Sequence, residues 1–293
     1  MAIGGNLGGS HFSCAGVNDS GTLLTKVEET PINPNQSQEE ILGAMAELVN
    51  GLKCELVQKG FKVVGFGTGA PGPANFDTGV IGETPNMPTM RGCRLNDELS
   101  NRTELPVKSN NDGNLTVFGE SRHGAARGYK NVFGNTLGTG LGGGLVINDE
   151  IYTGEDFSAT ELAKMPTSVG SLDNSTIEQL VSTGGIMARY HSLTGQQADP
   201  KEIEALAKGG DKKAQNTYDW FGKWLGFELA WVQGLLAPDI MVIGGKIAKG
   251  WDLFAPAMFA MLQLHTWKKD VLVVPAALGE AGPIIGGASL FLG

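Results

Sequence analysis

The chain has 293 residues, of which 41% are hydrophobic, and it carries a formal net charge of −9. This length is too great for one small domain and too short for three, and the apolar content is sufficient for packed cores. The sequence contains no basic block, which argues against nucleic acids and anionic membranes as partners. Phosphate ligands are compatible with this charge, because glycine-rich loops bind phosphate through backbone N–H groups.

The three cysteines, Cys14, Cys54 and Cys93, lie far apart and form no CxxC pair. A sparse, odd number of cysteines is typical of a reduced, cytoplasmic protein rather than a disulfide-stabilised one. The first residues contain neither a basic stretch nor a long apolar run. We therefore expect no signal peptide and no transmembrane segment.

The first part of the chain alternates between apolar runs and turn residues. Ala2–Leu7, His11–Val17 and residues 22–27 are predicted to be three strands of an antiparallel meander. The turn Gly8-Gly9-Ser10 between the first two strands leaves room for a phosphate group to approach the backbone. Taken alone, this turn is explained more simply by a plain hairpin.

A helix and a buried strand come next. Ser37 and Glu40 have the spacing of a capping box, apolar residues then recur at helical intervals, and Gly60 ends the predicted helix. Residues 62–67 are predicted to be a buried strand that opens into a loop over residues 68–73. Helix, strand and loop in this order are typical of an α/β protein, in which ligands bind at the carboxyl ends of the strands.

One carboxylate, Asp112, follows the next apolar run. It lies in the polar segment 109–114, after the strand candidate 105–107 and before a helix-like segment over residues 115–122. Backbone N–H groups and the helix dipole at such a place keep a carboxylate ionised, so Asp112 is able to accept a proton from a bound hydroxyl group. Asp and Asn are also the ordinary residues that cap helices, and the rest of the chain has to decide between these interpretations.

Glycine-rich segments mark the second half of the chain. The strand candidate Val132–Leu137 leads into the glycine loop 138–144, and a further apolar run follows that loop. Because a strand rather than a helix follows, the pattern does not fit a Rossmann dinucleotide site, which argues against a dinucleotide-dependent oxidoreductase. No GxxxxGK[ST] motif occurs, so a Walker-type loop is excluded. Glu161 and Glu178, taken alone, are ordinary surface acids.

The C-terminal part contains a long amphipathic helix, a strand and a small-residue segment. Lys212–Leu236 is predicted to be the helix, and three tryptophans flank its apolar face, as at a core or a dimer interface. Residues 240–243 form a fully apolar strand candidate, which Gly244 and Gly245 follow. The segment 282–288 is predicted to be a helix that packs closely against a sheet.

These motifs follow one another in a fixed order along nearly the whole chain. Each motif is weak alone, but the order and the spacing together are specific. They are Gly8-Gly9-Ser10, Pro71-Gly72-Pro73, Pro85-Asn86, Asn111-Asp112-Gly113-Asn114, the glycine loop 138–144, Glu161, Glu178, Gly244-Gly245 and residues 281–288. The order resembles that of the ROK family of sugar kinases, which includes bacterial glucokinases and fructokinases.

The resemblance implies a two-lobed α/β fold, actin-like and hexokinase-like (ribonuclease H-like), with MgATP in an interlobe cleft. It implies that Asp112 removes the proton from the sugar hydroxyl as the oxygen attacks the γ-phosphate, a reaction that relies mainly on positioning and charge neutralisation. The sugar contacts that it implies are Gly72, Asn86, Asn111, Glu161 and Glu178. The nucleotide contacts that it implies are Gly8, Gly9, Ser10, Gly138, Thr139, Gly140, Gly244 and Gly245.

This chain departs from the family pattern at two places. The family's first-strand Asp, which helps to hold Mg²⁺, is Asn6 here, so we expect only a weak contact to Mg²⁺ through a water molecule. All four zinc-ligand positions of the family are replaced, and because an incomplete ligand set binds zinc poorly, we predict no structural zinc. The residues at those positions are Lys164, Val169, Ser171 and Thr176.

Two functions are consistent with the resemblance. The first is ATP-dependent phosphorylation of a hexose, with glucose or a close relative as the expected acceptor and fructose or an N-acetylhexosamine as alternatives. The second is a catalytically weak, sugar-binding regulator, which Asn6 and the lost zinc ligands motivate. Family repressors carry an N-terminal helix-turn-helix domain and this chain begins at its first strand, so we expect no DNA binding.

The resemblance also implies a division into lobes. Residues 1–111 are predicted to form the smaller lobe together with a C-terminal helix over residues 281–293. Residues 112–280 are predicted to form the larger lobe. The tryptophan-rich helix predicts a homodimer.

Overall fold

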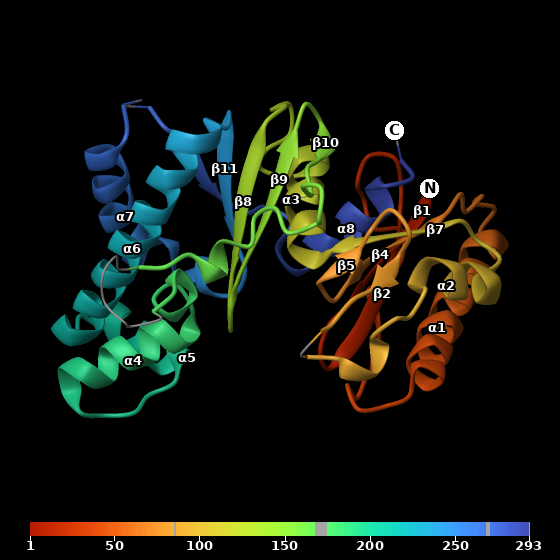
Figure 1. The fold of residues 1–293 in the computed structure, drawn as a ribbon, viewed down its shortest axis with the longest axis horizontal. Coiled ribbons are helices and arrows are strands. Elements are labelled where there is room, and N and C mark those ends of the chain that lie inside the picture. Colours follow the sequence, from red (N-terminus) through yellow and green to blue (C-terminus); the bar gives the residue numbers. More distant parts are fainter. Residues whose placement is uncertain (85, 168–174, 268–269, 293) are drawn as a thin grey trace. The chain divides into compact units, whose positions relative to one another are not determined.

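The computed structural model describes residues 1–84, 86–167, 175–267 and 270–292 (Figure 1). The chain divides into two compact units and passes between them at four places, one of which falls within strand β9 (Leu141–Ile147). The lobe boundary predicted after residue 111 stays a prediction. The first unit contains Met1–Lys130, Gly144–Ala159 and Ala277–Gly293, and the second contains Asn131–Gly143 and Thr160–Ala276.

The first unit is built on a five-stranded sheet with the strand order β3-β2-β1-β4-β7. The neighbouring strands β1, β4 and β7 are parallel, whereas β2 pairs antiparallel with β1 and with β3. The strands are β1 (Ala2–Leu7), β2 (His11–Val17), β3 (Glu28–Pro31), β4 (Phe66–Ala70) and β7 (Val107–Asn111). The helices of this unit are α1 (Gln38–Gln58), α2 (Leu95–Thr103), α3 (Asp112–His123) and α8 (Gly282–Ser289).

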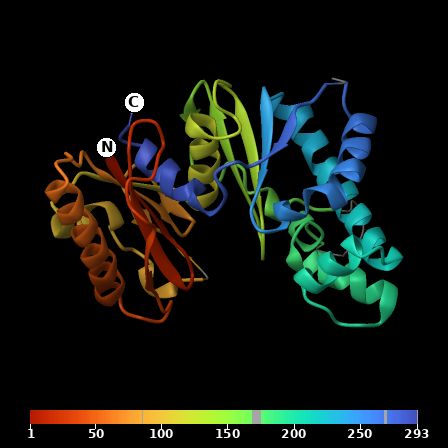
Figure 2. The same ribbon diagram turned by 180° about the vertical axis from the view of Figure 1, so that it is seen from behind.

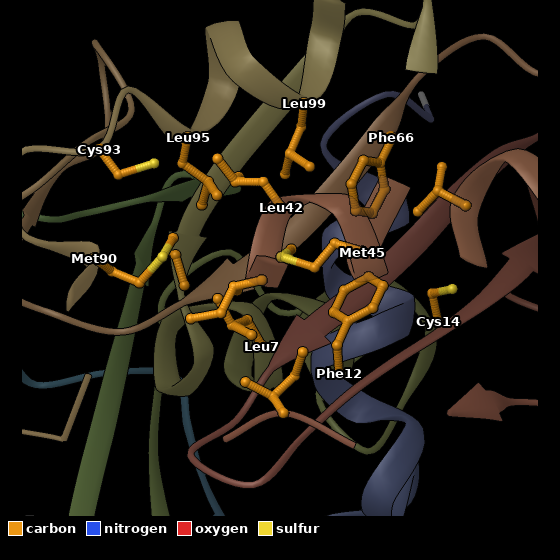
Figure 3. Close-up of a cluster of buried hydrophobic side chains, with 14 of the residues drawn as sticks. Leu7, Phe12, Cys14, Leu42, Met45, Phe66, Met90, Cys93, Leu95 and Leu99 are labelled. Carbon is orange, nitrogen blue, oxygen red and sulfur yellow. The ribbon is translucent and has the colours of Figure 1, made fainter. Parts of the chain in front are cut away.

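Side chains on β1 alternate between two apolar layers, as the pleat of a strand requires. Ile3 and Leu7 join the core that α1 and α2 cover, and Figure 3 shows Leu7 there beside Phe12 and Met45. Ala2 belongs instead to a second cluster, which packs against α8. The sheet is therefore buried on both faces.

Helix α8 packs unusually close to the sheet, and in Figure 2 it lies beside the first strand. A methyl group on Gly4 of β1 would collide with the carbonyl oxygen of Ile284, and one on Gly67 of β4 would collide with that of Gly287. Only glycine permits these backbones to approach so closely. The prediction of a small-residue helix packed against a sheet is confirmed.

Three strand predictions in the first unit are wrong in place or in bounds. One of them, the strand candidate at residues 105–107, is β7, which runs from Val107 to Asn111. Residues 22–27 form no strand, because Oδ1 of Asn18 accepts the N–H groups of Ser20 (3.1 Å) and Thr22 (2.8 Å) and holds this segment in a turn. The third strand lies later, at β3. The buried strand predicted over residues 62–67 begins at Phe66 and continues to Ala70, because its backbone pairs with β1 and β7 along that stretch.

The second sheet has the strand order β10-β9-β8-β11-β12. Its strands β8, β11 and β12 are parallel, and β10 pairs antiparallel with β9. Besides β9, they are β8 (Val132–Leu137), β10 (Glu150–Ile151), β11 (Ile240–Gly244) and β12 (Val273–Pro275). The helices of the second unit are α4 (Thr183–Thr194), α5 (Pro200–Lys208), α6 (Lys212–Leu236) and α7 (Trp251–His265).

Short elements complete the fold. They are β5 (Ala74–Asn75), β6 (Val80–Ile81) and the 3₁₀ helices η1 (Pro88–Met90), η2 (Leu162–Lys164), η3 (Ile177–Gln179), η4 (Ile247–Gly250) and η5 (Gly279–Ala281). Helix α6 has the predicted bounds, and α1 begins after the predicted capping box of Ser37 and Glu40. Over the part of the chain that the structure describes, no helix has both the length and the apolar character needed to cross a membrane.

Candidate active site

Polar residues gather where the parallel strands of the first unit end. Asn6 near the end of β1 is opposite Gly69 of β4, and β4 in turn runs in register with β7 as far as Asn111. The carboxyl ends of three neighbouring strands therefore lie side by side, which is where α/β proteins bind ligands. Asp112 directly follows β7, and a Cβ atom on Gly72 would lie 3.4 Å from Nδ2 of Asn111. The structure thus brings Asn6, Gly72, Asn111 and Asp112 to one edge of this sheet.

Helix α3 begins at Asp112, three residues earlier than the predicted segment. Its N-cap is Asn111, whose Oδ1 accepts the N–H groups of Gly113 (2.8 Å) and Asn114 (3.4 Å). The Gly113 N–H also lies 2.8 Å from Oδ1 of Asp112. The capping role therefore falls mainly to Asn111, and the carboxylate of Asp112 is exposed in the first turn.

Burial among the surrounding protein raises the pKa of the Asp112 carboxyl above its ordinary value of 3.8, while the hydrogen bond from Gly113 lowers it. The side chain also has exposed surface, and contact with solvent opposes the desolvation. The sequence indicates only the lowering contribution, because the burial that makes the larger one depends on the fold. A raised pKa makes the carboxylate a stronger proton acceptor.

Asn6 offers an oxygen atom without a protein partner. Its side chain is half-buried, and its Oδ1 is buried without a hydrogen-bond partner among the described residues. A buried polar atom that lacks a partner is unfavourable unless a ligand or water supplies one. This oxygen fits a water molecule bound to Mg²⁺.

The turn between β1 and β2 is a plain hairpin and also leaves room for a phosphate group beside its backbone. The Gly8 N–H donates to the carbonyl oxygen of His11 (3.0 Å), which closes a plain hairpin. The N–H groups of Gly9 and Ser10 have no acceptor within the described residues, and a Cβ atom on Gly9 would meet nothing within 4 Å. The Ser10 hydroxyl lies 3.1 Å from Nδ1 of His11. The turn therefore presents two N–H donors beside an open space, and backbone donors in such a turn are suited to bind an anion.

Two glycine motifs of the second unit lie together. Thr136 of β8 pairs with Gly244 of β11, so the loop that follows β8 begins beside the end of β11. A Cβ atom on Gly245 would collide with the carbonyl oxygen of Leu137, and Gly245 has a φ of +86°, which favours glycine. The loop over Gly138–Gly140 thus begins beside Gly244 and Gly245, and the nucleotide roles of these residues stay predictions.

Glu178 contacts the glycine loop directly. Its Oε2 accepts the N–H of Leu141 at 3.1 Å, and the side chain is half-buried. Glu161 is exposed at the start of η2, and the N–H of Ile177 donates to Met165 O (2.9 Å), which ties η3 to the residue after η2. The segments that carry Glu161 and Glu178 are therefore joined.

Other predicted positions stay predictions. Asn86 is exposed in the loop before η1 and forms no hydrogen bond within the described residues. Of the four residues at the family's zinc positions, Lys164 and Thr176 are described and supply neither a thiolate nor an imidazole, whereas Val169 and Ser171 lie outside the described residues.

One residue that positions α3 was not predicted from the sequence. Glu120 is fully buried, and its carboxylate accepts the N–H groups of Ala125 (2.7 Å), Ala277 (3.1 Å) and Leu278 (2.7 Å). It ties the helix that carries Asp112 to the chain that enters α8. A glutamate within a predicted helix gives no sign of such partners, since two of them lie more than 150 residues away.

The sequence profile of the ROK family matches residues 2–293. The chain belongs to the ROK family. It is 30% identical to a glucokinase of Thermotoga maritima, over 98% of this chain and 96% of that protein. It is 27% identical to an N-acetyl-D-glucosamine kinase of Mannheimia succiniciproducens, over 100% of this chain and 99% of the relative.

The fold is likewise that of solved ROK-family structures. A ROK family glucokinase from Streptomyces griseus, crystallised in complex with glucose and AMPPNP, matches with a TM-score of 0.82 and 25% identity over 99% of this chain and 98% of that one. A ROK hexokinase from Thermus thermophilus matches with the same TM-score and 26% identity, over 98% and 96% of the two chains. The predicted family and the predicted two-lobed, actin-like fold are confirmed.

Proposed function

We propose that this ROK-family chain is an ATP-dependent sugar kinase that transfers the γ-phosphoryl group of ATP to a hexose hydroxyl. The observation that carries this proposal is the position of Asp112, exposed in the first turn of α3 where the parallel strands of its sheet end. A carboxylate there accepts the proton of the sugar hydroxyl as its oxygen attacks the γ-phosphate.

The other site residues divide between sugar and nucleotide. N–H donors in the two glycine turns bind the phosphate groups, and side chains at the strand ends and in η2–η3 bind the sugar hydroxyls. The proposed sugar contacts are Gly72, Asn86, Asn111, Glu161 and Glu178, and the proposed nucleotide contacts are Gly8, Gly9, Ser10, Gly138, Thr139, Gly140, Gly244 and Gly245.

Glucose or a close relative is the proposed acceptor, because the glucokinase of Thermotoga maritima has a higher identity to this chain (30%) than the N-acetyl-D-glucosamine kinase has (27%). An N-acetylhexosamine is the alternative that the kinase of Mannheimia succiniciproducens supports. A coupled assay of ADP release across hexoses and N-acetylhexosamines tests the proposal. ATP-dependent turnover with none of these sugars would contradict it, and calorimetric sugar binding without MgATP binding would favour a regulator.

Magnesium is the proposed metal, and together with ATP it would supply positive charge that neutralises the phosphate groups. Asn6 Oδ1, which is buried without a partner among the described residues, would hold a metal-bound water. An amide supplies no charge, so Asn6 contributes less to metal affinity than a carboxylate would. We propose that zinc has no structural part here, since Lys164 and Thr176 are unsuited to bind it.

Asn6→Asp is expected to lower the Mg²⁺ concentration for half-maximal activity by about three- to tenfold, because a charged acceptor binds a metal-bound water roughly twice as strongly as a neutral one. The measurement is a Mg²⁺ titration of turnover at saturating ATP and sugar. Asn96→Asp is the matched control, since Asn96 also has a buried Oδ1 without a partner in the described residues but lies on α2. Equal Mg²⁺ requirements for all three proteins would contradict the role of Asn6.

We propose that the kinase is a homodimer formed through one side of α6. Trp220, Trp224, Phe227 and Trp231 follow one another at helical spacing with ring centroids 5.9–6.4 Å apart, and Trp231 is 51% exposed. Sedimentation should give twice the 30.8 kDa of one chain, and Trp231→Glu should give the single mass. A monomeric wild type would overturn this arrangement.

The three free thiols support a cytoplasmic location.

A further inference from the structure

The loop Gly138–Leu141 is held at both ends by a single neighbouring segment, residues 178–183 of the second unit. At the start of the loop, Gly138 O accepts the N–H of Thr183 (2.9 Å). At its end, the N–H of Leu141 donates to Oε2 of Glu178 (3.1 Å). Between these two fixed points, the N–H groups of Thr139 and Gly140 have no acceptor within the described residues. These are the two donors that a phosphate group would use.

The backbone of the segment that carries Glu178 is held by hydrogen bonds on both sides. It lies in η3, where the N–H groups of Leu180 (3.0 Å) and Val181 (2.8 Å) both donate to Ile177 O. The N–H of Ile177 donates to Met165 O (2.9 Å), which fixes η3 from the other side. A Cβ atom on Gly140 would lie 2.6 Å from Oε2 of Glu178, so the carboxylate is packed against the loop backbone.

We infer that Glu178 is a positioning residue for the nucleotide as well as a sugar contact: one carboxylate oxygen holds the phosphate loop in place while the other is left for a sugar hydroxyl. This inference rests on the proposed kinase function. A carboxylate accepts several hydrogen bonds at once, so the two roles do not compete. The bond from a backbone N–H to an ionised carboxylate is among the stronger hydrogen bonds in proteins. Its loss frees the loop, which must then be ordered each time a nucleotide binds.

The test measures nucleotide binding in the absence of sugar. Calorimetry with Mg²⁺ and AMPPNP is carried out on the full chain, as wild type, Glu178→Ala, Glu178→Gln and Asn86→Ala. We expect Glu178→Ala to bind the nucleotide about tenfold more weakly, as loss of one charged hydrogen bond implies. Glu178→Gln keeps an acceptor oxygen and should stay within about threefold of the wild type. A residue that contacts only sugar would leave nucleotide affinity unchanged in every variant.

Asn86→Ala is the matched control, because Asn86 is a proposed sugar contact in the first unit and forms no hydrogen bond within the described residues. It should weaken sugar binding and leave nucleotide affinity unchanged. Thermal unfolding of each variant checks that the fold is intact. Should Glu178→Ala fail to fold, hydrogen exchange of the Leu141 N–H decides: protection in the wild type and in Glu178→Gln is expected, and a freely exchanging amide in the wild type overturns the inference.

The outcomes separate this inference from the proposed function. A folded Glu178→Ala that binds AMPPNP as tightly as the wild type, while the wild type phosphorylates a sugar, overturns the positioning role alone. A wild type that neither binds MgAMPPNP nor phosphorylates any sugar overturns both.

Discussion

Replacing Asp112 with asparagine is expected to lower kcat by about 10²- to 10⁴-fold, the usual contribution of a general base. The amide keeps an oxygen that accepts the Gly113 N–H, so the first turn of α3 stays intact, but it no longer accepts a proton. Sugar and nucleotide affinities should change little, because the substituted group acts on the proton in the transition state. The measurements are steady-state kinetics with calorimetry of sugar and AMPPNP binding.

The pH dependence of kcat/KM gives a second signature of Asp112. Since burial raises its pKa above 3.8, the carboxylate becomes protonated at a higher pH than an ordinary aspartate, and activity should fall as the pH drops through that raised pKa. The residual activity of the asparagine variant should lack this acid limb.

Asp97→Asn is the matched control for Asp112. Asp97 is also in the first turn of a helix of the first unit, but it is exposed and paired with Arg94 (2.7 Å). Loss of an exposed ion pair changes stability by less than about 1 kcal/mol, and kcat should not change. An Asp112→Asn variant with wild-type kcat would refute the assignment of the base.

The elements whose signals are local were predictable. The capping box at Ser37 and the 25-residue helix α6 depend on spacing within one segment, and both were placed correctly. The residues at the carboxyl edge of the first sheet were also predictable, because the order of strand, loop and helix determines which residues follow a parallel strand. Family membership was predictable from the order of the glycine motifs, although no single motif is specific enough to show it.

Interactions between distant segments were not predictable. The bond between Glu178 and Leu141 joins residues 37 apart, and that between Glu120 and Leu278 joins residues 158 apart. Nothing in composition or periodicity distinguishes such a glutamate from one on the surface. The predictions of strand ends failed for a related reason. Residues 62–65 are apolar enough for a strand, but the bounds of β4 are determined by its backbone pairing with β1 and β7.

Two buried glutamates show that hydrogen-bond partners determine whether a buried carboxyl group is suited to carry a charge. Glu120 receives three backbone N–H donors and has a fixed structural role. Glu228 of α6 is 1% exposed, and among the described residues it is bonded to one group, Nδ2 of Asn135 on β8 (2.8 and 2.9 Å). Desolvation raises the pKa of Glu228 to about 7, although the bond from Asn135 lowers it. The first site is suited to a charge and the second is not.

Protonation of Glu228 should therefore make the second unit more stable at mildly acidic pH. An unfolded chain releases this proton near pH 4.5 and the folded chain near pH 7, so between these values the folded state binds more protons and its stability falls as the pH rises. The loss is on the order of 3 kcal/mol across that window, at about 1.4 kcal/mol per pH unit. All five tryptophans belong to the second unit, so their fluorescence during urea unfolding measures this change.

Glu228→Gln is expected to remove that pH dependence and to exceed the wild type in stability at pH 8 by on the order of 3 kcal/mol. The new amide accepts from Nδ2 of Asn135 and donates to its Oδ1, which is buried without a partner among the described residues. Glu120→Gln is the matched control with the opposite sign, because its amide N–H₂ would face backbone donors, and circular dichroism should report a loss of stability. Parallel pH profiles for the wild type and Glu228→Gln would mean that Glu228 is ionised in the folded chain, and Asn135 alone would then have to stabilise a fully buried charge, which one amide donor does not do.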